Sequence, residues 1–208
     1  MITRIPLISD RCGVFAPQYF GSVGYYATMA RYRRVVVDRD LRYDKRFKSV
    51  HRCEIADTRG RLMLTVPVSK SSPRRWADAT VSDHGGWWDV HRVSLESAYG
   101  RTPFFEYYID RFLPLVQDTS VSIVDLDCCI DAVVRRTLGL ECEVEYAVGD
   151  MDAVDDYRRG MYPSVADVPY YQVRADRLGF LPGLSILDLI FNMGPEAPLM
   201  LERMYNAK

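Results

Sequence analysis

The sequence has 208 residues and a formal net charge of −1. A chain of this length can bury one substantial core and is too short for two ordinary domains, so we predict a single domain over residues 1–208. The near-neutral charge and the lack of a known binding motif make a nucleic acid the weakest partner class. No apolar run reaches membrane-spanning length and no secretory leader pattern opens the chain, which predicts a cytoplasmic protein with no membrane span.

The five cysteines include no Cys-x-x-Cys pair, and Cys128 and Cys129 are adjacent. This pattern, with its odd count, fits reduced thiols in the cytoplasm, and Cys128 and Cys129 are expected as small core residues of a helix. It offers no zinc motif, and His84 and His91 are too far apart in sequence for the usual close pair, so we expect no metal and no cofactor. Charge, in contrast, is uneven: residues 31–52 carry nine Lys or Arg against three acids, while residues 141–156 carry seven acids and no base. One end of the fold is therefore expected to attract anions.

In chain order, residues 14–20 predict a first strand running into a turn, residues 21–31 a helix, and the apolar run 34–38 a strand covered on both faces. Strand, helix and strand within this length indicate a βαβ unit with a parallel pair. Residues 17–24 then lie at the carboxyl end of a strand, where open α/β sheets bind ligands and free amides favour phosphate. A plain strand-to-helix turn is the alternative. The binding candidates here are Pro17, Gln18, Tyr19, Gly24 and Tyr25.

Residues 40–52 are too polar for a core element and predict a long basic loop. A solvated charged surface is one interpretation. The other is a site for a phosphorylated, ring-containing ligand, because Tyr43, Phe47 and His51 alternate with basic residues. The candidates on this loop are Lys45, Arg46, His51 and Arg52. A turn at residues 57–60 between two apolar runs then predicts a β-hairpin over 53–68.

Two histidines and two tryptophans fall within residues 82–108. Glycines at 85, 86 and 100 bound a predicted helix that begins near Trp87 and places Trp88, His91, Leu95 and Ala98 on one face. A second helix is predicted from Thr102-Pro103, which makes an αα-hairpin with aromatic walls.

His91 fits two interpretations. It is either a core histidine that donates to a backbone carbonyl, or part of an acid–base group with His84, Asp83 and Glu96 beside aromatic surfaces. The second interpretation makes these four residues the catalytic candidates, with Trp88 and Tyr99 covering a substrate ring.

The remaining elements are a helix over 121–138 with an outer Asp131–Arg135 pair, a half-exposed edge strand over 141–148 and a short closing strand at 170–173. Residues 149–169 have no periodicity and predict a lid or an oligomer arm. Residues 185–193 predict a buried helix that Gly194-Pro195 ends. Its only polar positions, Asp188 and Asn192, share a face and need partners or a ligand, although capping with Ser185 is an alternative for Asp188.

Several ordered motifs resemble the WbqC-like family of bacterial proteins over residues 14–195. They are Pro17-Gln18-Tyr19-Phe20 with Gly24-Tyr25-Tyr26, the Tyr43 to Arg52 region leading to Leu64-Thr65-Val66-Pro67-Val68, Ser82-Asp83-His84-Gly85 with His91, Tyr99 with Pro103-Phe104-Phe105, and Phe180 to Asn192. The sequence departs from longer members at residues 149–169, where an acidic stretch replaces another block, and at Val50-His51-Arg52.

The resemblance implies a role in bacterial surface-polysaccharide (O-antigen) biosynthesis, as a transferase that moves an acyl or aminoacyl group to a nucleotide-linked amino sugar. The alternative is a non-catalytic binding or assembly module that uses the aromatic hairpin as an interface. The predicted fold is α/β, with a small, mostly parallel or mixed sheet flanked by helices plus the αα-hairpin. The predicted partners are a small-molecule substrate, such as a nucleotide-activated sugar, and a second copy in a homo-oligomer.

Overall fold

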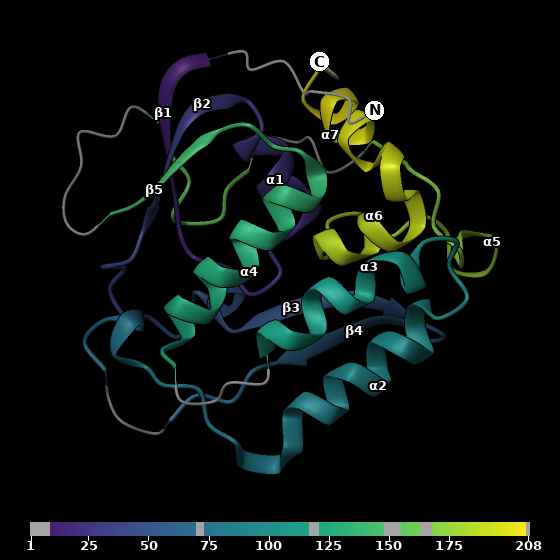
Figure 1. The fold of residues 1–208 in the computed structure, drawn as a ribbon, viewed down its shortest axis with the longest axis horizontal. Helices are drawn as coiled ribbons and strands as arrows, with labels where there is room; N and C mark the ends of the chain where they lie inside the picture. Colours follow the sequence, from purple (N-terminus) through teal and green to yellow (C-terminus); the bar gives the residue numbers. More distant parts are fainter. Residues whose placement is uncertain (1–8, 70–72, 117–120, 148–154, 163–167, 207–208) are drawn as a thin grey trace.

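The computed structural model describes residues 9–69, 73–116, 121–147, 155–162 and 168–206. Its main sheet has four parallel strands in the order β5-β2-β1-β6, and a separate antiparallel pair is formed by β3 and β4 (Figure 1). The predicted α/β class with a mostly parallel sheet is confirmed.

The βαβ unit is also confirmed. β1 (Ser9–Phe15) leads through a turn to α1 (Val23–Met29), and β2 (Tyr32–Asp38) returns parallel to β1. Residues Val35–Asp38 of β2 are all buried, as a continuous apolar run in a covered strand requires. The first strand ends at Phe15, earlier than predicted, so the segment from Ala16 to Gly21 is all turn.

The edge strands come from the second half of the chain. β5 (Glu143–Ala147) pairs with β2 and exposes its glutamates, as predicted. β6 (Asp155–Asp156) pairs with β1 on the other side. The lid or arm predicted over 149–169 lies partly outside the described residues, and its described part begins with this paired strand.

The predicted hairpin is formed by β3 (Arg52–Asp57) and β4 (Gly60–Thr65), in register from Arg52 with Thr65 to Asp57 with Gly60. Beside it lies α2 (Trp87–Tyr99), and the chain then turns into α3 (Phe105–Phe112) (Figure 1). Both helices contact α6 (Ile186–Met193), which is buried almost all round as predicted.

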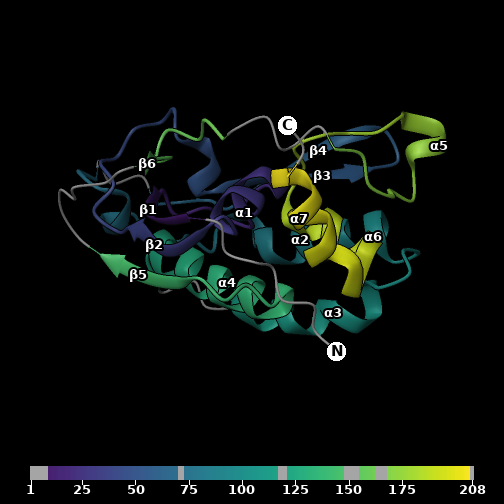
Figure 2. The ribbon, with the colours of Figure 1, turned by 90° about the horizontal axis from the view of Figure 1, so that it is seen from above.

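α4 (Ile123–Leu138) lies against one face of the main sheet, next to α3 (Figure 2). Ser122 caps its start by accepting a hydrogen bond from the Asp125 amide, and Gly139 ends it with a φ of 64°, a conformation that glycine adopts without steric cost. Two details of the prediction are wrong. Cys129 is exposed and Cys128 is buried, and the Asp131–Arg135 pair is largely buried because Tyr146 of β5 packs over it.

The rest of the chain is short helices. These are η1 (Lys48–Val50), η2 (Trp76–Asp78), η3 (His84–Gly86), η4 (Leu113–Val116), α5 (Ala175–Leu178), η5 (Gly194–Glu196) and α7 (Ala197–Asn206). The closing strand predicted at 170–173 is wrong, because these residues form no ladder and their polar side chains bond to α6 instead. Gly194-Pro195 does end α6, but α7 follows and packs on α1.

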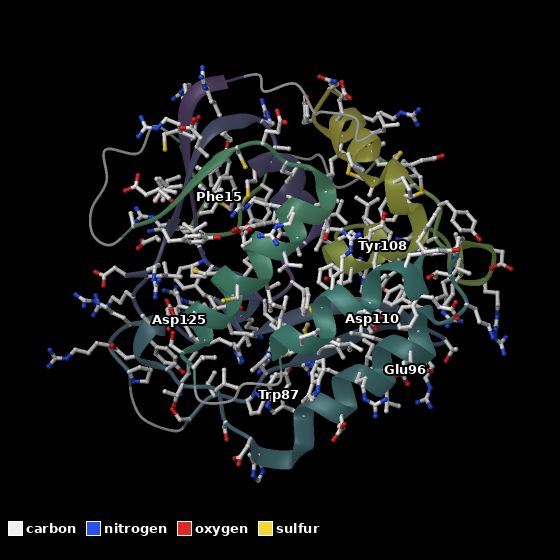
Figure 3. All side chains as sticks on the ribbon, in the orientation of Figure 1. Phe15, Trp87, Glu96, Tyr108, Asp110 and Asp125 are labelled. Atoms are coloured by element: carbon white, nitrogen blue, oxygen red, sulfur yellow. The ribbon has the colours of Figure 1, made fainter. Side chains whose placement is uncertain are left out.

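One hydrophobic core joins the two sheets and the helices. Figure 3 shows Phe15 among the side chains enclosed beside the main sheet. The same cluster includes Ile55 of β3, Ile130 of α4 and Phe191 of α6, each fully buried. In the part of the chain that the structure describes, no helix has both the length and the apolar character needed to cross a membrane.

Candidate functional site

The turn after β1 and the basic loop are separated in the sequence by α1 and β2, and they meet at the carboxyl end of β1. The Tyr19 amide donates to the Ser49 carbonyl at 3.0 Å, which joins the turn to η1. This is the edge where parallel sheets leave strand ends free for ligands. The sequence predicted both segments as ligand-binding, and the structure brings them together.

A cavity of about 240 Å³, here called the β1 pocket, opens at this junction. Five segments form its walls: the turn, η1 with the start of β3, Met63 of β4, the segment after β6, and the entry to α6. The lining residues are Gln18, Tyr19, Phe20, Gly21, Ser22, Lys48, Ser49, Arg52, Cys53, Glu54, Met63, Gly160, Tyr162, Gly183 and Ser185.

Backbone and side-chain hydrogen bonds fix the turn on the side facing α6. The Val23 amide donates to the Leu184 carbonyl at 2.9 Å, and the Ser185 hydroxyl donates to the Phe20 carbonyl at 2.8 Å. Phe20 has a φ of 41°, a conformation that costs a residue with a Cβ of the order of 1–3 kcal/mol. The surrounding bonds hold this strained geometry, so the wall of the pocket is already formed without a ligand.

The ionic groups of the β1 pocket are unevenly paired. Glu54 binds Arg61 at 2.8 Å, and both side chains are partly exposed. The Arg52 side chain has no hydrogen-bond partner among the described residues, and its Nε atom is enclosed. A guanidinium group has five N–H donors, so an unpaired one in a cavity wall favours an anionic ligand. Lys48 adds a second, exposed cation to the same wall.

The Cys53 thiol in this pocket is unsuited to nucleophilic attack. It is buried, and burial raises its pKa well above the usual value, with a smaller opposing effect from its hydrogen bond with Ser185. Because the thiolate is the reactive form, this cysteine stays a protonated part of the wall. Tyr162 also lines the cavity and accepts a hydrogen bond from Gln18 Nε2.

His91 lies behind the pocket, in the core. Its side chain is 3% exposed, its Nδ1 atom lies 3.0 Å from the Tyr19 hydroxyl, and its ring is held edge-on to Trp87. Burial lowers the pKa of His91 to about 4, against a backbone hydrogen bond at Thr65 that raises it, so the ring is neutral at physiological pH. His91 does not line the pocket, and its hydrogen bond with Tyr19 connects it to the pocket wall.

The other predicted catalytic side chains lie elsewhere. Asp83 and His84 are exposed at η3, before α2 begins. Glu96 is exposed near the far end of α2, where it pairs with Arg92 at 3.0 Å (Figure 3). The buried His91 and these three surface groups do not form one cluster.

Asp188, Asn192 and Tyr99 form a closed buried network. Asp188 accepts hydrogen bonds from Tyr99 at 2.9 Å, Tyr170 at 2.6 Å and Gln172 at 2.9 Å. Asn192 binds the Asp188 carbonyl at 2.8 Å and accepts from the Val173 amide. Burial raises the pKa of Asp188 although these donors act in the opposite direction. The adjoining cavity is only about 10 Å³, which leaves room for about one water molecule. The capping explanation for Asp188 is wrong, because its side chain bonds away from the helix start.

The remaining candidates do not line the β1 pocket. Pro17 and Tyr25 are buried and Gly24 lies inside α1, where its carbonyl accepts from Thr28. Lys45 and Arg46 are exposed, and Arg46 pairs with Asp44 at 2.6 Å. His51 donates to the Val66 carbonyl and stacks on Trp76, and burial lowers its pKa. Trp88 is half-buried against Trp87, which takes the inner position predicted for Trp88.

The pocket also contains residues that the sequence analysis missed. Lys48 belongs to the basic run and could have been included on charge alone. Gly160 and Tyr162 lie within the acidic segment that was predicted to be a lid, and nothing in their spacing indicates a wall of this cavity. Among the described residues, no group of three or more His, Cys, Asp or Glu is placed to hold a metal ion.

The fold and the β1 pocket define an α/β protein with a small-molecule-sized cavity at the carboxyl edge of a parallel sheet. A family model described as the WbqC-like protein family matches residues 16–157, more than half of the chain, so the chain belongs to this family. The matched region includes the turn, η1 and β3, but ends before Gly160 and Ser185. No curated protein and no solved structure matches the chain.

Proposed function

We propose that this WbqC-like protein binds a phosphorylated small molecule in the β1 pocket and transfers an acyl or aminoacyl group to an amino sugar. The observation that carries the proposal is the unpaired Arg52 guanidinium in the wall of a preformed cavity at a strand end. The surface-polysaccharide setting implied by the family resemblance supplies the substrate class. A nucleotide-linked amino sugar would bring both the phosphate and the nucleophilic amine.

The chain offers one carboxylate for the chemical step among the residues lining this pocket, that of Glu54. In the transfer, the amine nitrogen attacks the acyl carbonyl carbon, the carbon–nitrogen bond forms, and the bond to the leaving group breaks. Glu54 takes the proton that the amine loses. Arg61 holds Glu54 at the pocket rim. Cys53 takes no part because its pKa is raised, which favours direct transfer over a covalent intermediate.

His91 has a positioning role in this proposal. It fixes the Tyr19 hydroxyl, and Tyr19 forms part of the pocket wall. His84, Asp83 and Glu96 remain predictions from the sequence, and none of them lines the β1 pocket.

Binding is tested first, with the Arg52→Gln variant. Titration calorimetry with glucosamine 1-phosphate and with inorganic phosphate should show the affinity falling by about tenfold to a hundredfold, because a charge-assisted hydrogen bond contributes about 1.5–3 kcal/mol. Arg33→Gln is the matched control, since Arg33 is an exposed arginine near the amino end of β2, whereas the β1 pocket lies at the carboxyl edge of the sheet. Equal affinities for Arg52→Gln and the wild type would remove the phosphate from this pocket.

Transfer is tested next, with the Glu54→Gln variant. With acetyl-coenzyme A as donor and a UDP-linked amino sugar as acceptor, mass spectrometry should detect the acylated sugar with the wild type. The rate should fall by about 10²–10⁴ in Glu54→Gln, while the affinity for the sugar phosphate stays within about threefold. Glu106→Gln, an exposed change on α3, should match the wild type. A Glu54→Gln variant with full activity would contradict the role given to Glu54.

A non-catalytic assembly module is the second candidate. It is favoured by apolar side chains exposed on the aromatic hairpin: Val90 and Val93 on α2 are 57% and 54% exposed, and Tyr107 on α3 is 75% exposed. The absence of ligand binding and transfer, together with self-association weakened by Tyr107→Ser, would support this function over the enzyme.

A further inference from the structure

A second hollow lies beside the β1 pocket, at the carboxyl ends of β2 and β6. It consists of two cavities of about 440 and 820 Å³ that share Arg42, Phe47 and Arg159 as walls. The two cavities adjoin through these residues, and together they are called the β2 basin. Neither Arg42 nor Arg159 was a candidate in the sequence analysis.

Most charges in the β2 basin cancel within the protein. Arg158 binds Asp38 at 2.9 Å and Asp156 at 2.8 Å, which ties the end of β2 to the segment after β6. Asp40 binds Arg75 at 2.6 Å, and Arg46 binds Asp44 at 2.6 Å. The ion pairs account for all the carboxylates that line the basin.

Two guanidinium groups of the β2 basin are not used in these ion pairs. In the part of the chain that the structure describes, Arg42 and Arg159 make no ion pair and no side-chain hydrogen bond. They act on the acids only at longer range, where Arg42 helps to lower the pKa of Asp44 and Arg159 helps to lower that of Asp156. Two uncompensated positive charges around one hollow favour an anion such as phosphate.

Aromatic side chains stand beside these charges. Tyr43 and Phe47 are half-buried in the basin wall, and the Tyr43 ring is backed by Trp76 with 4.5 Å between ring centroids. A ring fixed in this way presents a surface on which a planar base can stack at little entropic cost. Phosphate and a planar ring occur together in a nucleotide.

The β2 basin and the β1 pocket are neighbours. Phe47 lines the basin and the next residue, Lys48, lines the pocket; likewise Arg159 lines the basin and Gly160 the pocket. The strands that end at the two hollows, β2 and β1, are hydrogen-bonded to each other, and paired strands lie about 4.8 Å apart. A diphosphate linkage is long enough to cross this separation.

From these observations we infer that the β2 basin binds the nucleotide part of a two-part ligand, with the ring near Tyr43 and Phe47 and a phosphate on Arg42 and Arg159. The group joined to the nucleotide then occupies the β1 pocket, a placement that rests on the proposed function. The substrate class is therefore a nucleoside diphosphate derivative that lies along the carboxyl edge of the sheet.

The test separates the two compartments with two small probes, UMP for the basin and glucosamine 1-phosphate for the pocket. In calorimetry, the double variant Arg42→Gln, Arg159→Gln should weaken UMP binding by about tenfold or more and leave glucosamine 1-phosphate binding within about twofold. Arg52→Gln should show the reverse selectivity. Arg33→Gln should change neither, which separates a local contact from a general loss of positive charge.

Each outcome decides the inference. Selective loss of UMP in the double variant supports the basin. UMP binding that is unchanged in the double variant, or absent in the wild type while glucosamine 1-phosphate still binds, overturns the basin and leaves the proposed function standing. Because Arg42 and Arg159 are exposed, both substitutions should leave the melting temperature unchanged, so a fold defect is recognised separately.

Discussion

Two helices of this protein each bury an aspartate one turn before a second polar residue, and they satisfy these groups in different ways. On α6 the pair is Asp188 and Asn192, and on α4 it is Asp127 and Asp131. Asp188 and Asp127 are both 1% exposed. Asp188 accepts hydrogen bonds from four side chains that surround it, those of Tyr99, Tyr170, Gln172 and Asn192. Neither carboxyl oxygen of Asp127 has a partner in the described part of the chain.

The surroundings of Asp188 and Asp127 also differ. The Asp188 network is closed, and the cavity beside it is too small for a ligand. Asp127 does not line the β1 pocket, but its charge, when ionised, raises the pKa of Tyr19 and of Cys53, two residues of the pocket wall. A buried polar residue is thus a weak indicator of function by itself. An unsatisfied one beside a cavity is a stronger indicator.

The largest expected effect is at the closed network, where the Asp188→Ala variant removes the carboxylate that accepts hydrogen bonds from four buried side chains. We expect a loss of about 3–5 kcal/mol in the free energy of unfolding, because the buried hydroxyl protons of Tyr99 and Tyr170 lose their acceptor, whereas the Gln172 amide keeps the Leu181 carbonyl. Urea unfolding followed by circular dichroism measures this. Asp188→Asn keeps one acceptor oxygen and should lose less. A loss below about 1 kcal/mol in Asp188→Ala would show that water replaces the carboxylate and that the network is open.

The comparison also separates what the sequence could predict from what it could not. The βαβ unit and the hairpin follow from apolar runs and turn residues close together in the chain. The meeting of the turn with the basic loop follows from topology, since β1 and β2 are parallel neighbours and the loop starts where β2 ends. These predictions depend on local pattern and on one rule about parallel sheets.

The sequence could not supply side-chain partners that come from distant segments. The hydrogen bond between His91 and Tyr19 joins residues 72 positions apart, so the helix pattern around His91 carried no information about it. Asp188 is satisfied by side chains 16 to 89 residues away. The inner tryptophan is Trp87, because the helix begins there and its first residue already faces the core. Tyr162 reaches the β1 pocket from an acidic segment without periodicity.

A smaller effect on stability is expected at Asp127 of α4, the aspartate whose carboxyl group has no hydrogen-bond partner among the described residues, and this effect depends on pH. Burial, reinforced by Asp131, raises the pKa of Asp127 well above its usual value, so the folded protein holds the protonated form. The unfolded chain ionises near pH 3.9, and therefore the contribution of Asp127 to stability is fully present below about pH 4 and declines as pH rises toward the folded-state pKa. Asparagine does not titrate. As pH rises through this window, the free energy of unfolding of the wild type should therefore fall relative to that of Asp127→Asn, by up to about 1.4 kcal/mol per pH unit.

Urea unfolding at about pH 4.5, 6 and 7.5 checks this prediction, since the slope is independent of any constant penalty from burying the amide of asparagine. Asp110→Asn is the matched control, because Asp110 is exposed on α3 and the same change of chemistry there should give curves parallel to those of the wild type. Parallel curves for Asp127→Asn as well would mean that Asp127 is ionised in the folded protein. It would then need a cationic partner, and the contrast between the closed site on α6 and the open site on α4 would disappear. A diverging pair of curves would instead establish Asp127 as a neutral, unsatisfied carboxyl group that interacts electrostatically with Tyr19 and Cys53 of the β1 pocket wall. Such a group can donate a proton when a ligand changes its surroundings.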